Sequence, residues 1–221
     1  MKELNNVTLA CVCTDRHNDA IIAAEICRKE FKFAEIVFFV SEEPKLKPAG
    51  IRFVIVPRLT DRNGTSDFVF KFAKKHLSTE FSMWFHWHGF ILNPSKWEDG
   101  FLDYDFIGAP WNWIHTGENT VGNGGFCIRS KRFFDAAEEI YNENGLTTYH
   151  PEDALLCRAY YKEMVAKGIK FAPEKVARRF SVENEPYNGG FGMHEIPKDI
   201  IDLKILELMY GAKITFGERK T

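Results

Sequence analysis

The stretch VTLACVCTDRHNDAIIAAEICRKEFKFAEIVFFV, residues 7–40, decides the fold. Its first part, residues 7–13, is a short apolar run typical of a buried strand. Residues 18–31 place three isoleucines and a cysteine on one face of a helix, and residues 36–40 return to a β-branched and aromatic run. A strand, a helix and a second strand in this order predict a β-α-β unit at the start of an α/β fold.

The alternation continues to residue 87. Residues 53–56 and 82–87 are two further strand-like runs, and residues 63–66 cap a helix that lies between them. This order predicts a central, mostly parallel sheet flanked by helices. Beyond it, the hydrophobic pattern predicts helices at 133–141, 154–165 and 200–210 and a short strand at 170–172.

Composition narrows the function classes. The 221 residues are 45% hydrophobic and carry a net charge of −2, which disfavours a protein held to nucleic acid mainly by phosphate contacts. The five cysteines are odd in number and form no CxxC pair, so we expect a reducing cytoplasm and neither structural disulfides nor a zinc-thiolate site. Since no apolar run reaches 18 residues, we also expect no membrane span.

Histidines form the first candidate site. His86 and His88 follow at i and i+2 in the last predicted strand, where both side chains would point to one side and reach one metal ion. An alternative is that both are ordinary polar residues at a sheet edge. His194 follows a glycine-rich loop at 188–192 and offers a third imidazole.

Acidic, aromatic and glycine residues supply the other candidates. Trp111 is either a stacking wall for a sugar or a base, or part of the core. The glycines around Asn123 let a ligand approach the backbone closely, although a plain turn explains them equally well. Glu152 and Asp153 stand in the first turn of a predicted helix, where the helix dipole stabilises acidic side chains. Either carboxylate could instead deprotonate an acceptor hydroxyl.

The order and spacing of these motifs along the chain are more specific to a family than any single motif is. The strings FHWHGFILNPSKWEDGFLDYDFIGAPW, VGNGGFCIRSKRFF, PEDALLC, KFAPEKVARRFSVE and FGMH lie within residues 81–194. Together they resemble a poorly characterised glycosyltransferase family with YDFIGAPW, GNGGF and PED motifs. The resemblance implies a single GT-A-like, Rossmann-like α/β domain over residues 1–221. Its parts would be a nucleotide-binding half at 1–88, an acceptor and catalytic half at 89–197, and a C-terminal helix and tail at 198–221.

In GT-A enzymes, a DxD-like motif after a central strand holds a divalent metal that bridges the donor diphosphate. Here that place reads His86-Trp87-His88, and His88 stands where the family usually has an aspartate. The resemblance thus implies Mn²⁺ or Mg²⁺ held by His86, His88 and His194, with Asp103 or Asp105 as a replacement carboxylate. Imidazoles suit Mn²⁺ less well than carboxylates do, so an enzyme that works without metal remains the alternative.

The resemblance also assigns roles to the other candidates. Asp153 matches the base of inverting enzymes, and Glu152 would position donor or acceptor hydroxyls. Gly124 and Gly125 match a glycine pair that lines the sugar pocket. Arg129 would join the donor site, and Trp111 and Asn123 the acceptor site.

The expected function is a cytoplasmic, inverting hexosyl- or pentosyltransferase that uses a nucleotide-sugar donor. A glycan or lipid-linked glycan is the expected acceptor, and a hydroxylated nucleic-acid base is an alternative. Two other classes stay open. One is a nucleotide-sugar-binding module that has lost catalysis, and the other is a metal-dependent hydrolase built on the histidines.

Overall fold

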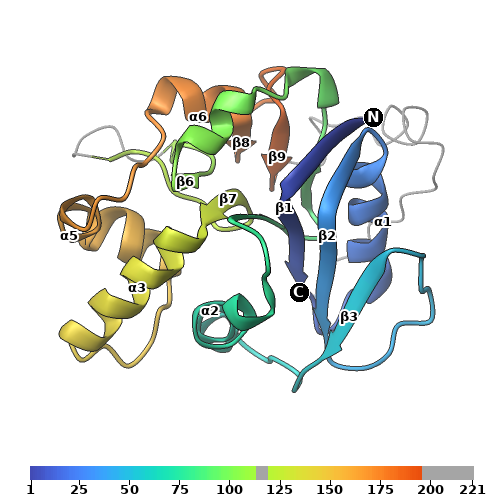
Figure 1. The fold of residues 1–221 in the computed structure, drawn as a ribbon, viewed down its shortest axis with the longest axis horizontal. Helices are drawn as coiled ribbons and strands as arrows, with labels where there is room; N and C mark the ends of the chain where they lie inside the picture. The colour runs from blue at the N-terminus through green and yellow to red at the C-terminus, as the bar shows by residue number, and fades with distance from the viewer. Residues whose placement is uncertain (113–118, 196–221) are drawn as a thin grey trace.

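A six-stranded sheet forms the centre of the computed structural model, which describes residues 1–112 and 119–195 (Figure 1). The strands follow the order β3-β2-β1-β4-β7-β6. Their bounds are Lys2–Val12 for β1, Phe31–Val40 for β2, Ile51–Ile55 for β3, Phe81–Phe85 for β4, Phe106–Ile107 for β6 and Phe126–Ser130 for β7. The first four are mutually parallel, and β7 runs antiparallel to both β4 and β6. The predicted α/β fold with a mostly parallel sheet is confirmed.

Helices cover both faces of this sheet. The longest are α1 (His17–Arg28), α2 (Arg62–Lys71) and α3 (Lys131–Glu143). The connection from β1 to β2, which contains α1, moves toward the β3 edge of the sheet. The connection from β3 to β4, which contains α2, moves in the opposite direction, toward the β6 edge. Because both connections are right-handed, α1 and α2 lie on opposite faces. Asp61 caps α2 by accepting a hydrogen bond from the Gly64 amide at 2.7 Å.

A second, three-stranded sheet has the order β5-β9-β8, with bounds Gly89–Ile91, Gly192–His194 and Ser181–Glu183. In its register Gly89 pairs with His194, and His194 pairs with Glu183. The alternation of the first half does not predict this sheet, because its strands are three residues long and β5 lies more than 90 residues before its partner β9. It brings the C-terminal part of the described chain to the end of β4.

The remaining elements correct several local predictions. The helix expected at 154–165 is divided into α4 (Glu152–Ala154), a π-helical turn (Leu155–Ala159) and α5 (Tyr161–Ala166). The strand expected at 170–172 is a single bridge between Phe106 and Phe171. Helix α6 spans Glu174–Phe180, and short 3-10 turns span Ala73–His76, Pro94–Lys96 and Asp99–Asp103. The helix expected at 200–210 lies outside the described residues.

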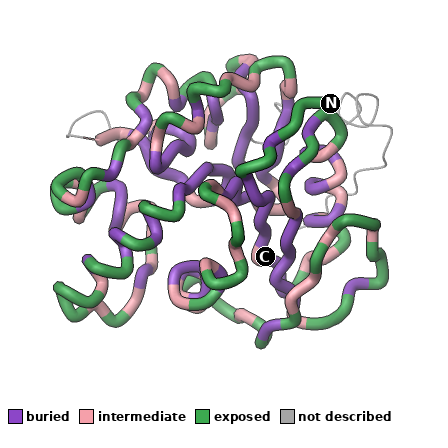
Figure 2. Tube along the Cα trace, in the orientation of Figure 1, coloured by how far each residue is buried: buried purple, intermediate pink, exposed green. Residues whose placement is uncertain are grey.

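The core follows the strands. Figure 2 shows buried residues along β1 and β2, while much of the surrounding helix and loop surface is exposed. All five cysteines are buried and free, and burial raises the pKa of Cys27 to about 12. In the part of the chain that the structure describes, no helix is both long and apolar enough to cross a membrane.

Candidate functional site

The histidine pair lies where β4 ends. The chain leaves the strand after Phe85 and turns tightly, with the Gly89 amide donating a hydrogen bond to the His86 carbonyl at 3.0 Å. His86 and His88 therefore occupy a turn and not the strand that we predicted. Their rings nevertheless converge, with centroids 5.4 Å apart. Since ligands of open α/β sheets bind at the carboxyl ends of parallel strands, this turn is at the expected place for a site.

His194 completes a cluster of three imidazoles. Pairing of β9 with β5 brings its Nε2 atom to 3.1 Å from Nε2 of His88. The His86 and His194 ring centroids are 5.3 Å apart. One nitrogen from each of the three rings lies within 4.8 Å of the other two, a spacing that one metal ion can bridge. The structure thus brings the three predicted ligands together.

Two carboxylates lie next to this histidine cluster, and the sequence analysis identified neither of them. Glu195 Oε1 lies 3.2 Å from His88 Nε2, and Glu183 Oε1 lies 2.9 Å from His194 Nδ1. The Asn123 side-chain nitrogen lies 3.0 Å from the same His194 Nδ1. No sequence signal identified either glutamate, because both reach the cluster through the second sheet.

The backbone is unusual around this cluster. Among the described residues, the non-glycine positions with positive φ are Asn123 at 66°, Asn184 at 51° and Glu195 at 49°. Asn123 and Glu195 contact the cluster directly, and Asn184 follows Glu183 in sequence. Such conformations are costly and concentrate at functional sites, above all for a glutamate, which lacks asparagine's preference for this region.

His86 is in a positive neighbourhood. Burial is the largest cause that lowers its pKa well below the usual range, and the charges of His194, His88 and Arg129 lower it further. Glu195 opposes this shift. The His86 ring is therefore neutral at pH 7 and keeps a lone pair available for a ligand.

A second network surrounds Glu152. Its carboxylate accepts hydrogen bonds from Arg129 Nη2 at 3.1 Å and from Ser66 Oγ at 2.8 Å. The Arg129 side chain is only 2% exposed, and its guanidinium packs 5.1 Å from the centroid of the Phe70 ring. Among the described residues, no hydrogen-bond acceptor contacts Arg129 Nε. The network therefore holds a buried guanidinium, paired with Glu152, beside the histidine cluster.

Asp153 holds a proton more tightly than an ordinary aspartate does. Burial, followed by the negative charge of Glu152, raises its pKa above that of an ordinary aspartate. Its hydrogen bond with the Ala154 amide at 2.8 Å and the charge of Arg129 lower the pKa but do not cancel the rise. The charge of Glu183, which contacts His194, also raises this pKa.

Gly124 and Gly125 form the boundary between the two networks. A Cβ atom on Gly124 would lie 2.3 Å from Glu152 Oε1, whereas one on Gly125 would lie 2.0 Å from His194 Nε2. A side chain at either position would therefore displace its neighbour, the Glu152 carboxylate at position 124 and the His194 ring at position 125. The predicted glycine pair thus separates the acidic network from the histidine cluster by one residue.

Other predicted residues have different positions. Trp111 is 5% exposed and belongs to the core, where a Cβ on Gly122 would lie 1.8 Å from its ring. Asp105 accepts hydrogen bonds from Ser130 Oγ at 2.6 Å and the Lys170 amide at 2.9 Å. Neither Asp103 nor Asp105 belongs to the groups of described residues whose atoms could share a metal ion, and the carboxylates beside the histidines are those of Glu183 and Glu195.

The site extends toward the end of β1. The Arg16 guanidinium stacks 4.2 Å from the centroid of the Trp87 ring, between the two cluster histidines in sequence. Ser41, after β2, donates a hydrogen bond to the Thr14 carbonyl at 2.6 Å. The carboxyl ends of β1, β2 and β4 therefore share one edge of the sheet.

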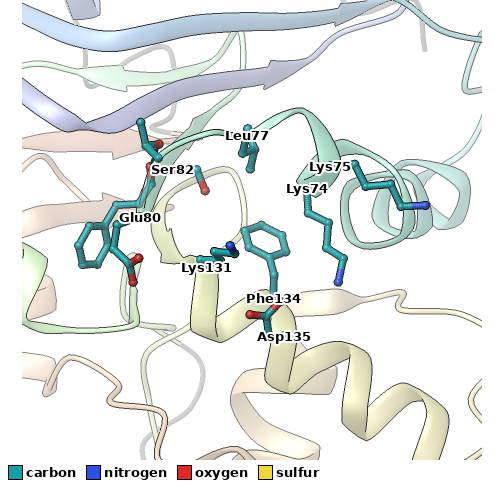
Figure 3. Close-up of a pocket in the computed structure, with 10 residues that line it drawn as sticks. Lys74, Lys75, Leu77, Glu80, Ser82, Lys131, Phe134 and Asp135 are labelled. Carbon is teal, nitrogen blue, oxygen red and sulfur yellow. Dashed lines mark hydrogen bonds between the residues drawn. The ribbon is translucent and has the colours of Figure 1, made fainter.

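A cavity of about 280 Å³ lies elsewhere, at the amino end of β4. Figure 3 shows Lys74, Lys131 and Phe134 among the side chains around it. Lys74 pairs with Glu138. None of the predicted site residues lines this cavity.

Loss of the buried cation should destabilise the protein. We expect Arg129→Met to lower the free energy of unfolding by about 3 kcal/mol, because Glu152 keeps a partly buried charge without its cation. Urea denaturation of both proteins measures the difference. Arg158→Met is the control at an exposed position. An equal effect of the two substitutions would contradict a structural role for the Arg129–Glu152 pair.

Comparisons with solved structures show the fold. A glycosyltransferase involved in glycosylation of the major capsid of PBCV-1 aligns with a TM-score of 0.50 and 12% identity, over 85% of this chain and 91% of that one. The apo-form glycosyltransferase GlyE of Streptococcus pneumoniae TIGR4 aligns with a TM-score of 0.49 and 9% identity, over 95% of this chain and 60% of that one. This chain is thus similar in fold to a glycosyltransferase.

Sequence comparisons give a family without a known activity. No curated protein matches the chain. Residues 50–194, more than half of the 221 residues, match the family described as "Protein of unknown function (DUF5672)" and include both the histidine cluster and the Glu152 network. The chain therefore belongs to the DUF5672 family.

Proposed function

We propose that this protein is an inverting glycosyltransferase that moves a sugar from a nucleotide-diphosphate sugar to an acceptor hydroxyl. The observation that carries this proposal is the boundary at Gly124 and Gly125. On one side of it lie the Glu152 carboxylate and the buried Arg129, and Asp153, whose pKa is raised, follows Glu152 in sequence. On the other side lies His194 of the histidine cluster. Such a transfer needs a base for the acceptor and positive charge for the leaving diphosphate.

Asp153 is the proposed catalytic base. In an inverting transfer the acceptor oxygen attacks the anomeric carbon as the bond to the diphosphate breaks, and the base takes the hydroxyl proton. A carboxylate of raised pKa holds that proton more firmly than an ordinary aspartate does. Glu152 is less suited to the role because its oxygens already accept hydrogen bonds from Arg129 and Ser66.

Arg129 is proposed to face the donor. Its guanidinium is buried and paired with Glu152, so its charge would favour a donor phosphate bound nearby without a direct hydrogen bond. The Arg16–Trp87 stack provides a further cationic and aromatic surface at the ends of the parallel strands. Asn123 is less suited to the acceptor site, because its side chain already contacts His194 and the Gly125 amide.

A divalent cation fits the histidine cluster. His88 and His194 would hold it, with a nitrogen of His86 as the third imidazole within 4.8 Å of both. When bound, the ion supplies positive charge where the diphosphate leaves. The donor atoms are mainly imidazole nitrogens, which differ from the carboxylate oxygens of a DxD motif.

We propose a glycan or lipid-linked glycan as acceptor and a reducing cytoplasm as compartment. The five buried, free cysteines support the compartment. The net charge of −2 favours a glycan over a nucleic-acid base.

Donor binding is the first test of this function. A ligand that binds only the folded state raises the melting temperature, so we expect one nucleotide sugar to raise it by about 5 °C at 100 times its Kd. Melting is measured against a panel of nucleotides and nucleotide sugars, each with Zn²⁺, Mn²⁺, Mg²⁺ or a chelator. If no nucleotide or nucleotide sugar changes the melting temperature in any of these conditions, the proposed function is wrong.

A retained shift without turnover would identify the binding module that has lost catalysis. Release of free sugar at the same rate with and without acceptors would favour the hydrolase. Transfer to an acceptor hydroxyl is the result that the proposal requires.

A further inference from the structure

We infer that the histidine cluster is selective for Zn²⁺ over Mg²⁺ and Mn²⁺, with His88, His194 and Glu195 as ligands and Glu183 as the residue that positions His194. This inference rests on the proposed function for the ion's role beside the donor. The binding of the ion rests on the cluster's own residues.

Donor chemistry is the first argument. Mg²⁺ and Mn²⁺ prefer carboxylate, carbonyl and water oxygens, and Mg²⁺ demands a nearly octahedral set of them. The cluster offers an imidazole nitrogen from His88 and another from His194, with a third from His86 within 4.8 Å of both. Two imidazoles and one carboxylate are a ligand set that zinc accepts readily.

Spacing supports the same assignment. With metal–ligand bonds of 2.0–2.1 Å, two ligand atoms on a tetrahedral zinc ion are separated by about 3.3 Å. The His88 Nε2 to His194 Nε2 distance is 3.1 Å, and the His88 Nε2 to Glu195 Oε1 distance is 3.2 Å. Both separations match edges of one tetrahedron, although a hydrogen bond would give similar distances.

The surroundings of His194 Nδ1 add to this argument. Glu183 Oε1 at 2.9 Å favours a proton on Nδ1, which leaves the lone pair on Nε2 facing His88, whereas the Asn123 side-chain nitrogen at 3.0 Å favours a lone pair on Nδ1. A carboxylate behind a metal-binding imidazole fixes the ring and makes it a stronger ligand. The Glu183–His194 pair therefore has the arrangement that zinc sites use.

Glu195 provides an independent sign of a ligand. Its φ of 49° is unusual for a glutamate, and its amide donates a hydrogen bond to the His88 carbonyl at 3.2 Å. The left-handed backbone conformation of Glu195 costs about 1 kcal/mol of conformational free energy, and it brings the Glu195 carboxylate to His88. This strained position is better explained if Glu195 is a metal ligand than if it is an incidental neighbour of His88.

The test begins with the full chain stripped of metal. We expect titration calorimetry to show one Zn²⁺ per chain with a Kd below about 1 μM. We also expect 10 mM Mg²⁺ neither to compete for the site nor to raise the melting temperature. Nitrogen sites generally bind zinc more tightly than Mn²⁺, so this ranking alone is not sufficient. Substitution with Co²⁺ adds a second readout, because tetrahedral Co²⁺ absorbs visible light much more strongly than octahedral Co²⁺.

Variants separate ligands from neighbours. We expect Glu195→Gln and His88→Ala to lower zinc affinity at least about 100-fold, and Glu183→Gln to lower it about 10–100-fold with one site retained. His76→Asn replaces an exposed histidine and should leave zinc affinity unchanged. His88→Asp should weaken zinc binding and strengthen Mn²⁺ binding, since it restores an oxygen donor. Melting of each metal-free variant shows that it is folded.

Several results would overturn the inference: weak or substoichiometric zinc, octahedral Co²⁺ spectra, competition by Mg²⁺, or equal effects of His88→Ala and His76→Asn. Donor binding is measured in parallel. A nucleotide sugar that binds a protein without zinc affinity removes the inference and leaves the proposed function. Tight binding of zinc to a protein that binds no nucleotide sugar would support the inference and contradict the proposed function.

Discussion

Asp153→Asn is expected to lower the rate of sugar transfer about 10²- to 10⁴-fold, the range of a lost general base, and to leave donor binding intact. Asparagine keeps the size of the side chain but cannot accept the acceptor proton at neutral pH. The change is read from turnover with saturating acceptor, and from the melting shift produced by the nucleotide sugar.

The matched control is Asp99→Asn, at a side chain that is 75% exposed and pairs with Lys2. It should leave transfer unchanged. Glu152→Gln gives a useful contrast, because it weakens the contact with the buried Arg129 and should lower stability as well as turnover. Substantial turnover by Asp153→Asn would remove Asp153 as the base.

The raised pKa of Asp153 also fixes the direction of two pH effects. The acidic limb of kcat/KM should lie above the ordinary aspartate value of about 3.9, because the base works only when ionised. For stability, a raised folded-state pKa means that the folded protein binds this proton more tightly than the unfolded chain. The charge thus costs stability as the pH rises from the unfolded to the folded pKa. Asp153→Asn should therefore melt at the same or a higher temperature at pH 7.

The sequence predicted the four parallel strands of the central sheet well, because hydrophobic periodicity reports local structure directly, but it did not predict β6 and β7. The strands at β1, β2 and β4 and the helix at α1 differ from the predicted ranges by a few residues at their ends. Hydrophobic periodicity could not predict the π-helical turn at Leu155–Ala159, because the apolar residues of this segment follow the same pattern as in an α-helix.

The histidine cluster shows where such reasoning stops. His86 and His88 were identified through their spacing, but they converge in a turn, and the strand geometry used to predict this was wrong. Glu183 and Glu195 were missed because only the pairing of β8 and β5 with β9 brings them to the histidines. Pairing between residues far apart in sequence leaves no local pattern in a single chain.

The boundary glycines allow the two networks to be disrupted one at a time. Gly125→Ala places its Cβ 2.0 Å from His194 Nε2, so we expect the ring to leave His88 and zinc affinity to fall at least about 100-fold. Gly124→Ala places its Cβ 2.3 Å from Glu152 Oε1 and 2.9 Å from Arg129 Nη2. This second variant should lose most transfer activity and still bind zinc.

Each substitution overpacks its surroundings, at a half-buried position for Gly124 and a buried one for Gly125, and should cost about 1–3 kcal/mol of stability. Zinc affinity, donor binding and turnover are therefore compared at a temperature where both variants are folded. Gly100→Ala is the control, because its nearest contact would be 3.5 Å away at Asp103. Separate losses in the two variants would mean that the histidine cluster and the acidic network are distinct parts of one site. If instead both variants lost zinc affinity and turnover together, the cluster and the network would form a single packed unit, and the division of roles between them would be wrong.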